Sequence, residues 1–427
     1  MVAATGAVRL DPPPSPTLTA DEKAFLDDLE RRAVRYFDEQ SEPATGLVRD
    51  RARADGTPHD ETHRNVASIA ATGFGLTALC IAADRGWMKR TSAIKRARRA
   101  LEFFDRKFPD EHGWRFHFVD VRSGARAWQS ELSSIDTAWL LMGVLAVRGC
   151  FGDDKMIVRH ATALYSRVDF RWMLNGSPSL LSMGWTPERG FLDARWGHYC
   201  ELMAMYLLAM GSPRSAIPSD AWFAWSRPVV TFGTYEFIGA SDPLFVHQYS
   251  HAWIDFRGRR EAREPGIDWW QNSMTATRAH RAFCVSLAGK FPSYSAEVWG
   301  ITASDGPSGY QAWGGPPAHG PIDGTVVPAA AGGSLMLTPD IALPALETMK
   351  VRWGTKIYGR YGFADAFNPK TGWVDPDVIG IDLGVMLLSA ENLRTGKVWE
   401  WTMASPEILA ALDKVAPRKA AAPTFSR

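Results

Sequence analysis

Cysteine is scarce in this chain of 427 residues, with only four, at Cys80, Cys150, Cys200 and Cys284. They show neither a CxxC spacing nor the Cys/His spacing of a zinc site. Each lies in an apolar context typical of a helix, so we expect buried thiols rather than disulfides or metal ligands. The cysteines therefore say little about the compartment in which the protein works.

Long runs of charge and of apolar residues are also absent. The 48 Lys and Arg residues nearly balance the 47 Asp and Glu residues, which leaves a formal net charge of +1. Without a basic stretch, nucleic acid and anionic membranes are weak candidates as partners. The longest apolar stretch, 66–83, is interrupted by polar and small residues, which favours a closely packed buried helix over a membrane span. The start lacks the apolar core of a signal peptide, although removal of a signal would leave a similar Pro-rich start.

Signatures of nucleotide binding and of serine hydrolysis are missing as well. There is no Walker A sequence, no GxGxxG after a strand and no GxSxG elbow. Phosphate chemistry and serine hydrolysis are therefore disfavoured. Aromatic residues are what the chain has in excess, with 18 Trp and 21 Phe. A large aromatic core and a set of stacking surfaces for a ligand explain this excess equally well.

Helical periodicity dominates the chain. Thr19 is placed to cap a first helix, and apolar segments then alternate with amphipathic ones. The predicted helices are 21–39, 66–84, 91–108, 134–147, 155–168, 196–210, 218–225, 269–288, 324–337, 339–352, 380–393 and 406–415. This alternation predicts an all-α fold, an (α/α)6 toroid in which an inner ring of helices is enclosed by an outer ring.

Strand signals are sparse, and no change of composition marks a second domain. We expect loop hairpins within 114–121 and 227–237. The predicted organisation is one domain over 19–416, with flexible tails at 1–18 and 417–427.

Three carboxylates lie where surface charge does not explain them. Ser133 or Ser134 is placed to cap a helix, which puts Asp136 in its first turn and Glu131 in the loop before it. A helix N-terminus lowers the pKa of a carboxylate and suits a base, although Asp136 would also serve simply to complete the cap. Glu201 lies in a segment that is apolar nearly all round. It needs a buried cationic partner, or a pocket in which desolvation raises its pKa as suits a general acid. An acid and an ionised carboxylate are the pair that glycoside hydrolysis needs.

Two polar and aromatic segments suit a pocket for a ligand with many hydroxyl groups. The first is HQYSHAWIDFR over 247–257, and the second is WGITASDGPSGY over 299–310, which is too rich in Gly and Pro for a helix. We expect substrate contacts from these segments and two later loops, at His247, Tyr249, His251, Trp253, Asp255, Arg257, Trp299, Asp305, Tyr310, Asp323, Asp365 and Asn368. The structural alternatives are an internal Asp255–Arg257 ion pair and Asx turns at Asp323 and Asn368.

The i, i+4 spacing of His247 and His251 is the strongest hint of a metal. The residue after His247 is Gln248 instead of the glutamate of an HExxH motif, and a third ligand would have to be Asp255. Hydrogen bonding is therefore favoured for both histidines. We expect neither a metal nor a cofactor.

At these residues the chain resembles the bacterial glycoamylase-like family, which includes glycoside hydrolase family 144. The matching segments occur in the family's order and cover about residues 25–402. They are TGLVRD (45–50), NVASIAATGFGLTAL (65–79), ELSSIDTA (131–138), HYCELMAMYLLAMGSP (198–213), HQYSHAWIDFRG (247–258), NS (272–273), WGITASDGPSGY (299–310), DGT (323–325), YGFADAFN (361–368), GIDLG (380–384) and EN (391–392).

The resemblance implies an (α/α)6 glycoside hydrolase that acts on β-1,2-glucan, inverting and endo-acting, without a cofactor. Some related members release sophorose from chain ends. It also implies a periplasmic or secreted protein. The family's favoured general acid maps onto Glu201, the Asp of its IDTA segment onto Asp136, and the preceding acidic residue onto Glu131.

Two departures from the family's pattern bear on the substrate. Leu383, Gly384 and Val385 replace a frequent Gln-Gly-Pro, and Cys200 and Leu202 flank Glu201 where many members read YNEY. These departures bear more on which glycosidic linkage is cleaved than on the class of reaction. A transglycosylase, a hydrolase of another linkage, a carbohydrate-binding protein without catalysis and a polysaccharide lyase stay open. Closed toroids are often monomers, so we expect a monomer.

Overall fold

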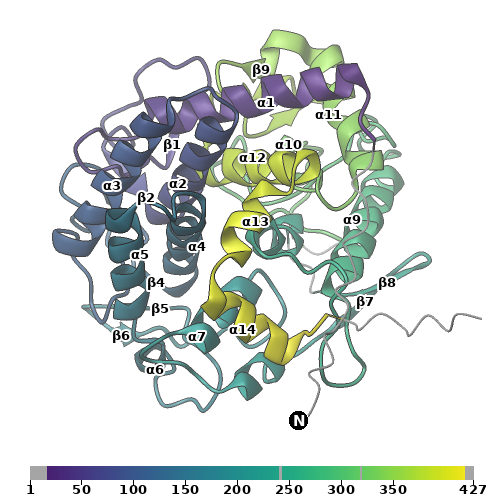
Figure 1. Ribbon diagram of the computed structural model, residues 1–427. Coiled ribbons are helices and arrows are strands. Elements are labelled where there is room, and N and C mark those ends of the chain that lie inside the picture. The colour runs from purple at the N-terminus through teal and green to yellow at the C-terminus, as the bar shows by residue number, and fades with distance from the viewer. Residues whose placement is uncertain (1–16, 240–242, 318–319, 419–427) are drawn as a thin grey trace, which may run out of the picture.

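The computed structural model describes residues 17–239, 243–317 and 320–418. Within them an inner ring is formed by α2 (Ile69–Asp84), α4 (Ser134–Cys150), α7 (Met203–Gly211), α8 (Tyr249–Trp253), α10 (Pro328–Gly332) and α12 (Gly380–Arg394). Helix α2 packs on α4, α4 on α7, α7 on α8, α10 on α12, and α12 returns to α2 (Figure 1). The remaining contact in the ring, between α8 and α10, is made by Gln248. Its side chain donates to the Ala330 carbonyl (2.8 Å) and to Ser334 (2.7 Å). The ring is therefore closed.

An outer layer of helices covers this ring. It consists of α1 (Ala20–Glu39), α3 (Arg90–Arg106), α5 (Lys155–Arg167), α9 (Trp269–Ser286), α11 (Pro339–Trp353) and α14 (Pro406–Val415). Helix α1 packs on α12, α3 on α2, α5 on α4, α11 on α10 and α14 on α7. Helix α13 (Lys397–Met403) contacts α4, α8 and α12, and so crosses one end of the ring. The predicted all-α (α/α)6 toroid is confirmed.

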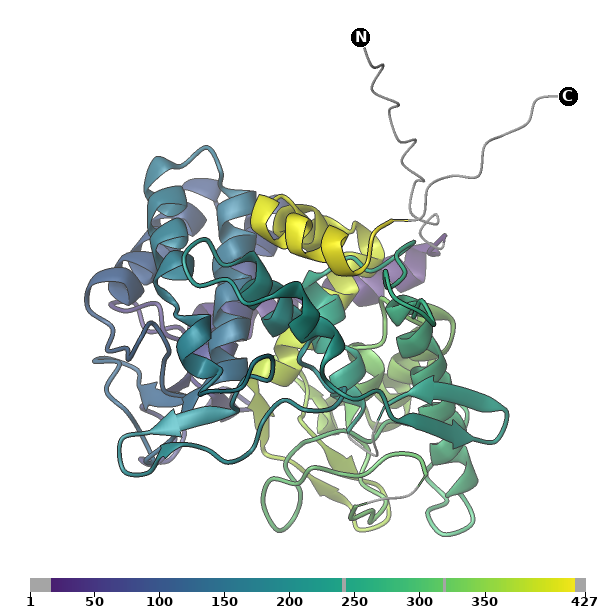
Figure 2. The ribbon, with the colours of Figure 1, turned by 90° about the horizontal axis from the view of Figure 1, so that it is seen from below.

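Short strands and long loops gather on one side of the toroid, with α14 on the other (Figure 2). The antiparallel pairs are β1 (Arg51–Arg53) with β13 (Asp377–Ile379), β2 (Val66–Ser68) with β3 (Phe118–Asp120), β4 (Leu132–Ser133) with β5 (Gly184–Thr186), β5 with β6 (Gly190–Phe191), β7 (Val229–Phe232) with β8 (Tyr235–Ile238), β9 (Tyr358–Gly359) with β10 (Gly362–Phe363), and β11 (Phe367–Asn368) with β12 (Trp373–Val374). Strands β2, β4 and β13 lead directly into α2, α4 and α12, so these inner helices begin on the strand side.

Both predicted hairpins have counterparts in the structure. The segment 227–237 forms the β7–β8 hairpin. In the segment 114–121, β3 turns back onto residues 125–127, where the N–H of Asp120 donates to the Ala125 carbonyl at 2.7 Å, and on its other edge it pairs with β2, about fifty residues earlier in the chain.

Glycine lets α2 and α4 approach each other closely. A Cβ atom added to Gly143 would lie 2.1 Å from the carbonyl oxygen of Gly73, and one on Gly73 would lie 2.2 Å from that of Trp139. Such distances are too short for any side chain. The predicted close packing of the apolar helix within 66–84 is confirmed.

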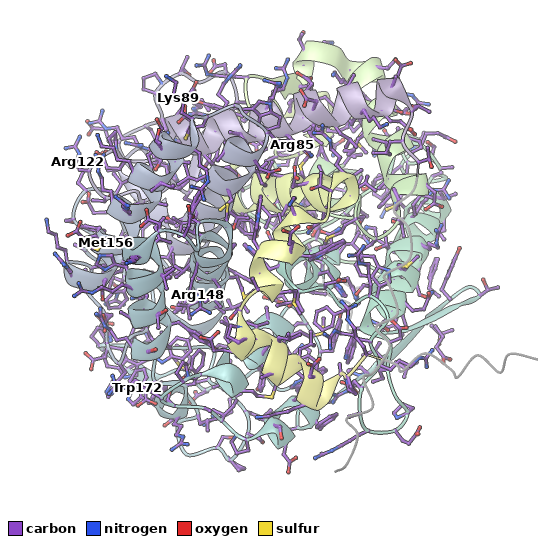
Figure 3. All side chains as sticks on the ribbon, in the orientation of Figure 1. Arg85, Lys89, Arg122, Arg148, Met156 and Trp172 are labelled. Atoms are coloured by element: carbon purple, nitrogen blue, oxygen red, sulfur yellow. The ribbon has the colours of Figure 1, made fainter. Side chains whose placement is uncertain are left out.

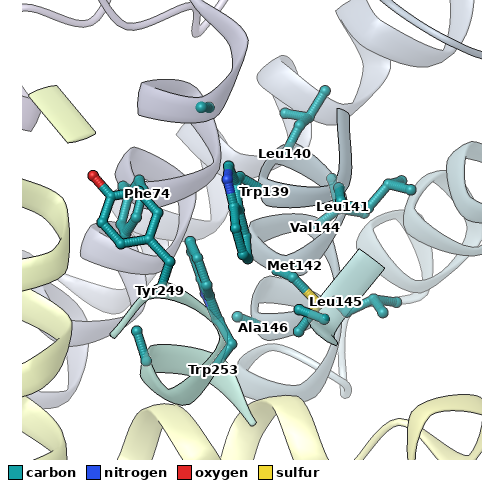
Figure 4. Packing of buried hydrophobic residues seen from close by; sticks show 14 of the residues in the cluster. Phe74, Trp139, Leu140, Leu141, Met142, Val144, Leu145, Ala146, Tyr249 and Trp253 are labelled. Atoms are coloured by element: carbon teal, nitrogen blue, oxygen red, sulfur yellow. The ribbon is translucent and has the colours of Figure 1, made fainter. Parts of the chain in front are cut away.

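An aromatic stack fills the centre of the ring (Figure 4). Trp253 lies 4.5 Å from Phe74 and 5.5 Å from Trp139, measured between ring centroids. Its indole N–H donates to Thr77 at 3.2 Å. A fully buried tryptophan with a satisfied N–H stabilises a core strongly, so much of the aromatic excess is structural.

Most predicted helix boundaries lie within a few residues of the observed ones, and the cap at Thr19 is confirmed by its capping box with Glu22. Two predictions were too long. Residues 196–202 are held in an irregular path, where the N–H of Tyr199 donates to the Ser226 carbonyl. Residues 324–327 are likewise bound by other segments, and Val326 exchanges hydrogen bonds with Phe367.

Short elements were missed by the sequence analysis. These are α8, α13, α6 (Phe170–Met173) and the 3-10 turns η2 (Leu244–His247) and η3 (Gly354–Lys356), while the predicted helix over 218–225 is the 3-10 turn η1 (Ser219–Phe223). The tails predicted at 1–18 and 417–427 lie almost wholly outside the described residues, and the single-domain prediction over 19–416 stays a prediction.

Three of the four cysteines predicted as buried thiols, Cys80, Cys200 and Cys284, are buried, whereas Cys150 is only partly buried. Burial raises the pKa of the Cys284 thiol to about 12 and that of Cys80 well above its usual value. No helix among the described residues combines the length and apolar character that crossing a bilayer requires.

Candidate active site

Polar and charged side chains meet where the inner helices begin. Asp136 lies in the first turn of α4, Asp382 in the first turn of α12, and Tyr249 is the first residue of α8. Glu201 lies in the turn that precedes α7. The charges of Asp382 and Glu201 both raise the pKa of Tyr249. The charge of Asp50 raises the pKa values of both Asp136 and Asp382. The strand side of the toroid therefore carries one extended polar site.

The first cluster of this site contains His117, Glu131 and Asp136. Ser133 caps α4 by accepting the N–H of Asp136 at 3.2 Å, and its hydroxyl donates to the carboxyl group of Asp136 at 2.5 Å. The imidazole of His117 lies between the two acids, with Nδ1 3.2 Å from Glu131 and Nε2 3.4 Å from Asp136. Its ring stacks on Phe118 at 3.8 Å. Of the two residues predicted to cap this helix, Ser133 and Ser134, the structure confirms Ser133.

The pKa values of this cluster follow from burial and from these contacts. Burial lowers the pKa of His117, but the charge of Asp136 and the contacts with Glu131 outweigh it and raise that pKa to about 9. Burial raises the pKa of Glu131, but the hydrogen bond and the charge of His117, together with the charge of Arg126, outweigh it, so the pKa is lowered. For Asp136 burial is the largest contribution. It raises the pKa, although the charge of His117 and the hydrogen bond from Ser133 lower it. The predicted lowering of the Asp136 pKa by the helix N-terminus is therefore wrong.

The second cluster is a pair of buried carboxyl groups, Asp365 and Asp382, which are 4% and 5% exposed. Burial raises the pKa of Asp382 to about 7, and burial together with the charge of Asp382 raises the pKa of Asp365 well above its usual range. A cavity of about 10 Å³ borders both residues, and the other residues that line it are apolar. Tyr310 completes the cluster, since burial of its hydroxyl and the charges of both acids raise its pKa, while the residue as a whole is 52% exposed.

Arg51 connects the two clusters. Its guanidinium lies 3.1 Å from Asp50 and donates to Asp305 at 2.6 Å. The N–H of Asp305 in turn donates to Asp365 at 2.8 Å. Asp50 acts on His117 of the first cluster as well. One arginine thus holds together a network in which carboxyl groups outnumber cations.

Glu201 is placed differently from the prediction. It is half-buried in a turn, and α7 begins only at Met203. Ser250 fixes this turn against α8, since its hydroxyl donates to the Glu201 carbonyl at 2.7 Å and accepts the N–H of Ala204 at 3.0 Å. The prediction of a carboxylate inside an apolar helix is wrong, because long-range contacts of residues 196–202 delay the start of the helix.

Several residues predicted to bind substrate are core residues instead. His251, Trp253 and Trp299 have no measurable exposure, so their side chains do not face a cleft. His251 bonds Ser273 at 2.9 Å, and His247 bonds the hydroxyl of Tyr199 at 3.0 Å.

The two histidines also do not share a helix face, because His247 ends the 3-10 turn η2 and α8 begins two residues later. Burial lowers the pKa of each imidazole to about 3, so both are neutral near pH 7. They act as hydrogen-bonding groups of the core.

Four further residues that were predicted to bind substrate form the ion pair and the Asx turns named above as structural alternatives. Asp255 and Arg257 form an ion pair at 2.8 Å beyond the C-terminal end of α8, where Arg257 covers the ring of Trp399 at 4.0 Å. Asp323 accepts the N–H of Thr325, and Asn368 accepts those of the residues two and three positions later. Tyr249, Asp305, Tyr310 and Asp365 are the predicted substrate residues that the structure brings together at the polar site.

Three groups of side chains in the described ranges have ligand atoms close enough together for a metal ion. They are His59 with Asp60 and His63, His117 with Glu131 and Asp136, and Asp305 with Asp375 and Asp377. In each group the atoms lie within 4.8 Å of one another. His117 and Arg51 already supply positive charge to the second and third groups.

Sequence reasoning missed Arg51, His117 and Asp382 as members of the site. Arg51 directly follows the TGLVRD segment, and Asp382 lies inside the GIDLG segment, so both were within reach. For His117 the only signal is an imidazole among the aromatic residues of 114–118, which does not point to a partner about fourteen residues away.

Comparison with a family model shows the family to which the chain belongs. The Glycoamylase model, described as "Putative glucoamylase", matches residues 193–406, half of the chain. The chain belongs to the glycoamylase family. The matched range includes Glu201, Asp305, Asp365 and Asp382 but not Asp136.

Relatives of known name support this assignment. The chain is similar to the exo β-1,2-glucooligosaccharide sophorohydrolase (non-reducing end) of Parabacteroides distasonis, with 25% identity over 437 residues, 93% of this chain and 58% of that protein. It therefore spans little more than half the length of that curated relative. It is also similar to an endo-β-1,2-glucanase of Chitinophaga pinensis in complex with sophorotriose and glucose (TM-score 0.85, 26% identity, 93% of this chain and 98% of the other).

A more distant structure shares the fold alone. The endo-β-1,2-glucanase of Talaromyces funiculosus, in complex with sophorose, has a TM-score of 0.64 at 12% identity and covers 93% of this chain and 92% of its own. The (α/α)6 toroid is therefore retained where sequence similarity has almost vanished.

Proposed function

We propose that this protein is a glycoside hydrolase that cleaves β-1,2-glucan by general acid–base catalysis. The observation that carries the proposal is that Glu131, Asp136, Glu201 and Asp382 gather on one side of the toroid, where the inner helices begin. Acid–base cleavage of a glycosidic bond needs one carboxyl group that keeps its proton and one that has lost it. The names of the relatives supply the linkage.

Glu201 is our proposed general acid. It is half-buried at the start of α7, and its backbone is fixed to α8 through Ser250. A carboxyl group held by rigid elements at the rim of a polar site is placed to protonate a leaving oxygen. Asp136 and Glu131, proposed from the sequence, remain the carboxylates that activate water, with His117 holding them in position.

The Asp365–Asp382 pair is a second candidate for the base, and a specific observation favours it. The charges of Asp382 and Glu201 both raise the pKa of Tyr249, and the side chains of Asp365 and Asp382 are hydrogen-bonded to each other. Asp382 gives up its proton near pH 7, as a base working at neutral pH must.

The stereochemistry of cleavage, the mode of action, the oligomeric state and the location are proposed from the resemblance to the family. We propose an inverting, endo-acting enzyme that works as a monomer after export to the periplasm or the medium. Polyol-binding contacts are assigned to Tyr249, Asp305, Tyr310 and Asp365, since these side chains lie at the carboxyl clusters. Light scattering and cell fractionation test the oligomeric state and the location.

Release of reducing ends from linear β-1,2-glucan tests the proposed function. The purified protein should release them, and Glu201→Gln should lower the rate about 10²–10⁴-fold, as expected for loss of a general acid. The matched control is Glu236→Gln, an exposed glutamate on β8 away from the clusters. Full activity of Glu201→Gln contradicts the assignment of the acid, whereas an inactive wild-type protein contradicts the substrate.

A further inference from the structure

A basic cavity lies beside the polar site. It has a volume of about 480 Å³ and is lined by Gln40, Arg49, Arg51, Ala52, Gly56, Thr57, Pro58, His59, Arg64, Asn65 and Arg122. Four of these residues are arginines and none is a carboxylate. Basic side chains are therefore concentrated in its lining, whereas the whole chain has a formal net charge of only +1. A cavity of this size accommodates a charged substituent of a sugar.

Two of the four arginines already have partners that fix them. Arg51 is bound to Asp50 and Asp305, and Arg49 donates to the backbone carbonyls of Gln40 and Arg64 and lies 3.7 Å from Glu42. These contacts hold the wall of the cavity in place and pair both guanidinium groups with carboxylates, so the charge available to a ligand comes from the other two arginines.

The other two arginines keep their charge accessible. Arg64 pairs only with Glu61, whose side chain is 88% exposed, so water screens that pair. Arg122 is exposed at the periphery of the molecule (Figure 3), and no carboxylate lies within salt-bridge distance of it in the part of the chain that the structure describes. Their guanidinium groups are therefore available to bind an anion.

The cavity adjoins both carboxyl clusters. On one side Arg51 leads through Asp305 to Asp365 by contacts of 2.6 and 2.8 Å. On the other side Arg122 closely follows β3, whose Phe118 stacks on His117. A glucan chain bound at the two clusters would pass close to the cavity.

We propose that this cavity binds an anionic group, a phosphate or a carboxylate, that is attached to the glucan chain in the site. The guanidinium fork binds the oxygens of such groups in a bidentate manner, and neutral hydroxyl groups do not match it in charge. The inference rests on the proposed function for the identity of the chain that carries the group. The positive charge of the cavity itself does not depend on that function. The enzyme would then prefer charged β-1,2-glucan over the neutral polymer.

Calorimetric binding at low ionic strength tests the cavity without any need for turnover. The probes are sophorose, sophorose carrying a phosphate ester, and inorganic phosphate. We expect phosphorylated sophorose to bind at least tenfold more tightly than sophorose, and added salt to reduce the difference. Arg64→Gln and Arg122→Gln should each remove most of this advantage. The control is Arg159→Gln, an exposed arginine on α5, which should keep it.

Each outcome decides one part of the proposal. Equal binding of both sugars by the wild-type protein overturns it, and so does an advantage that survives in both cavity variants. Binding of inorganic phosphate as tight as that of the phosphorylated sugar shows a site for free anions and overturns the attachment to glucan. An Arg122-dependent advantage in a protein that cleaves no β-1,2-glucan supports the cavity while contradicting the proposed function.

Discussion

The Nε2 atom of His117 lies 3.4 Å from a carboxyl oxygen of Asp136. The other ring nitrogen contacts Glu131, so one imidazole joins the loop before α4 to the first turn of that helix. Since the pKa of His117 is raised to about 9, the ring is protonated at neutral pH and neutralises one of the two acids. This contact shapes both the stability of the fold and the chemistry of the site.

The stability of the protein should fall between about pH 6.5 and pH 9. Because the pKa of His117 is higher in the folded state than the ordinary value of 6.5, protonated His117 stabilises the fold fully below pH 6.5. This contribution, about 3 kcal/mol at most, is lost as the pH rises through 9. Urea denaturation at a series of pH values measures it.

A pair of histidine variants separates this effect from other titrations. His117→Asn should reduce the decline between pH 6.5 and 9, to which Glu30 and Asp375, each with a pKa raised to about 8 by burial, also contribute. His112→Asn is the control, because His112 is exposed and its positive φ of 53° suits asparagine. An unchanged decline in His117→Asn would show that another group causes it.

Asparagine variants of Asp136 and Asp382 identify the base. Loss of the base should lower kcat about 10²–10⁴-fold, whereas loss of a supporting carboxylate should cost less. If Asp382 is the base, kcat of the wild-type enzyme should rise as the pH passes about 7, since the base must be deprotonated. The pH profile of kcat for both variants is the measurement, and a small, equal effect of both changes contradicts an acid–base role for either cluster.

Gly143→Ala should destabilise the protein by about 1–3 kcal/mol or more. The added methyl group would meet the backbone of Gly73, which cannot move as a side chain does. Gly289→Ala is the control, because a Cβ at that position has no neighbour within 4 Å. Urea midpoints measure both variants, and equal midpoints would contradict the close approach of α2 and α4.

The sequence was sufficient for features that depend on local periodicity and capping. Thr19 and Ser133 cap the helices that they were expected to cap, and alternation of apolar and amphipathic segments led to the toroid. Helix periodicity could not show that residues 196–202 bind Ser226, so the helix was predicted to begin before Glu201. Contacts between distant segments override local propensity in such places.

The composition of the site was harder to predict than its position. Trp253 and His251 have residue types typical of a sugar-binding site, yet both are fully buried. The pKa of Asp136 could not be inferred from its helix, because burial and charges from other loops determine it. Asp382 was identified only as a neighbour of Leu383 and Val385, since nothing in the sequence shows that the loop with Asp365 folds back onto the start of α12.

Proton NMR of the products formed from linear β-1,2-glucan tests the central claim most directly. The purified protein should release short sophoro-oligosaccharides whose new reducing ends first appear as the α-anomer, inverted from the β-linkage. Glu201→Gln, with an unchanged circular dichroism spectrum, should release almost none. Products with the retained β-anomer, longer or cyclic glucans, or no products from β-1,2-glucan at all would contradict the account.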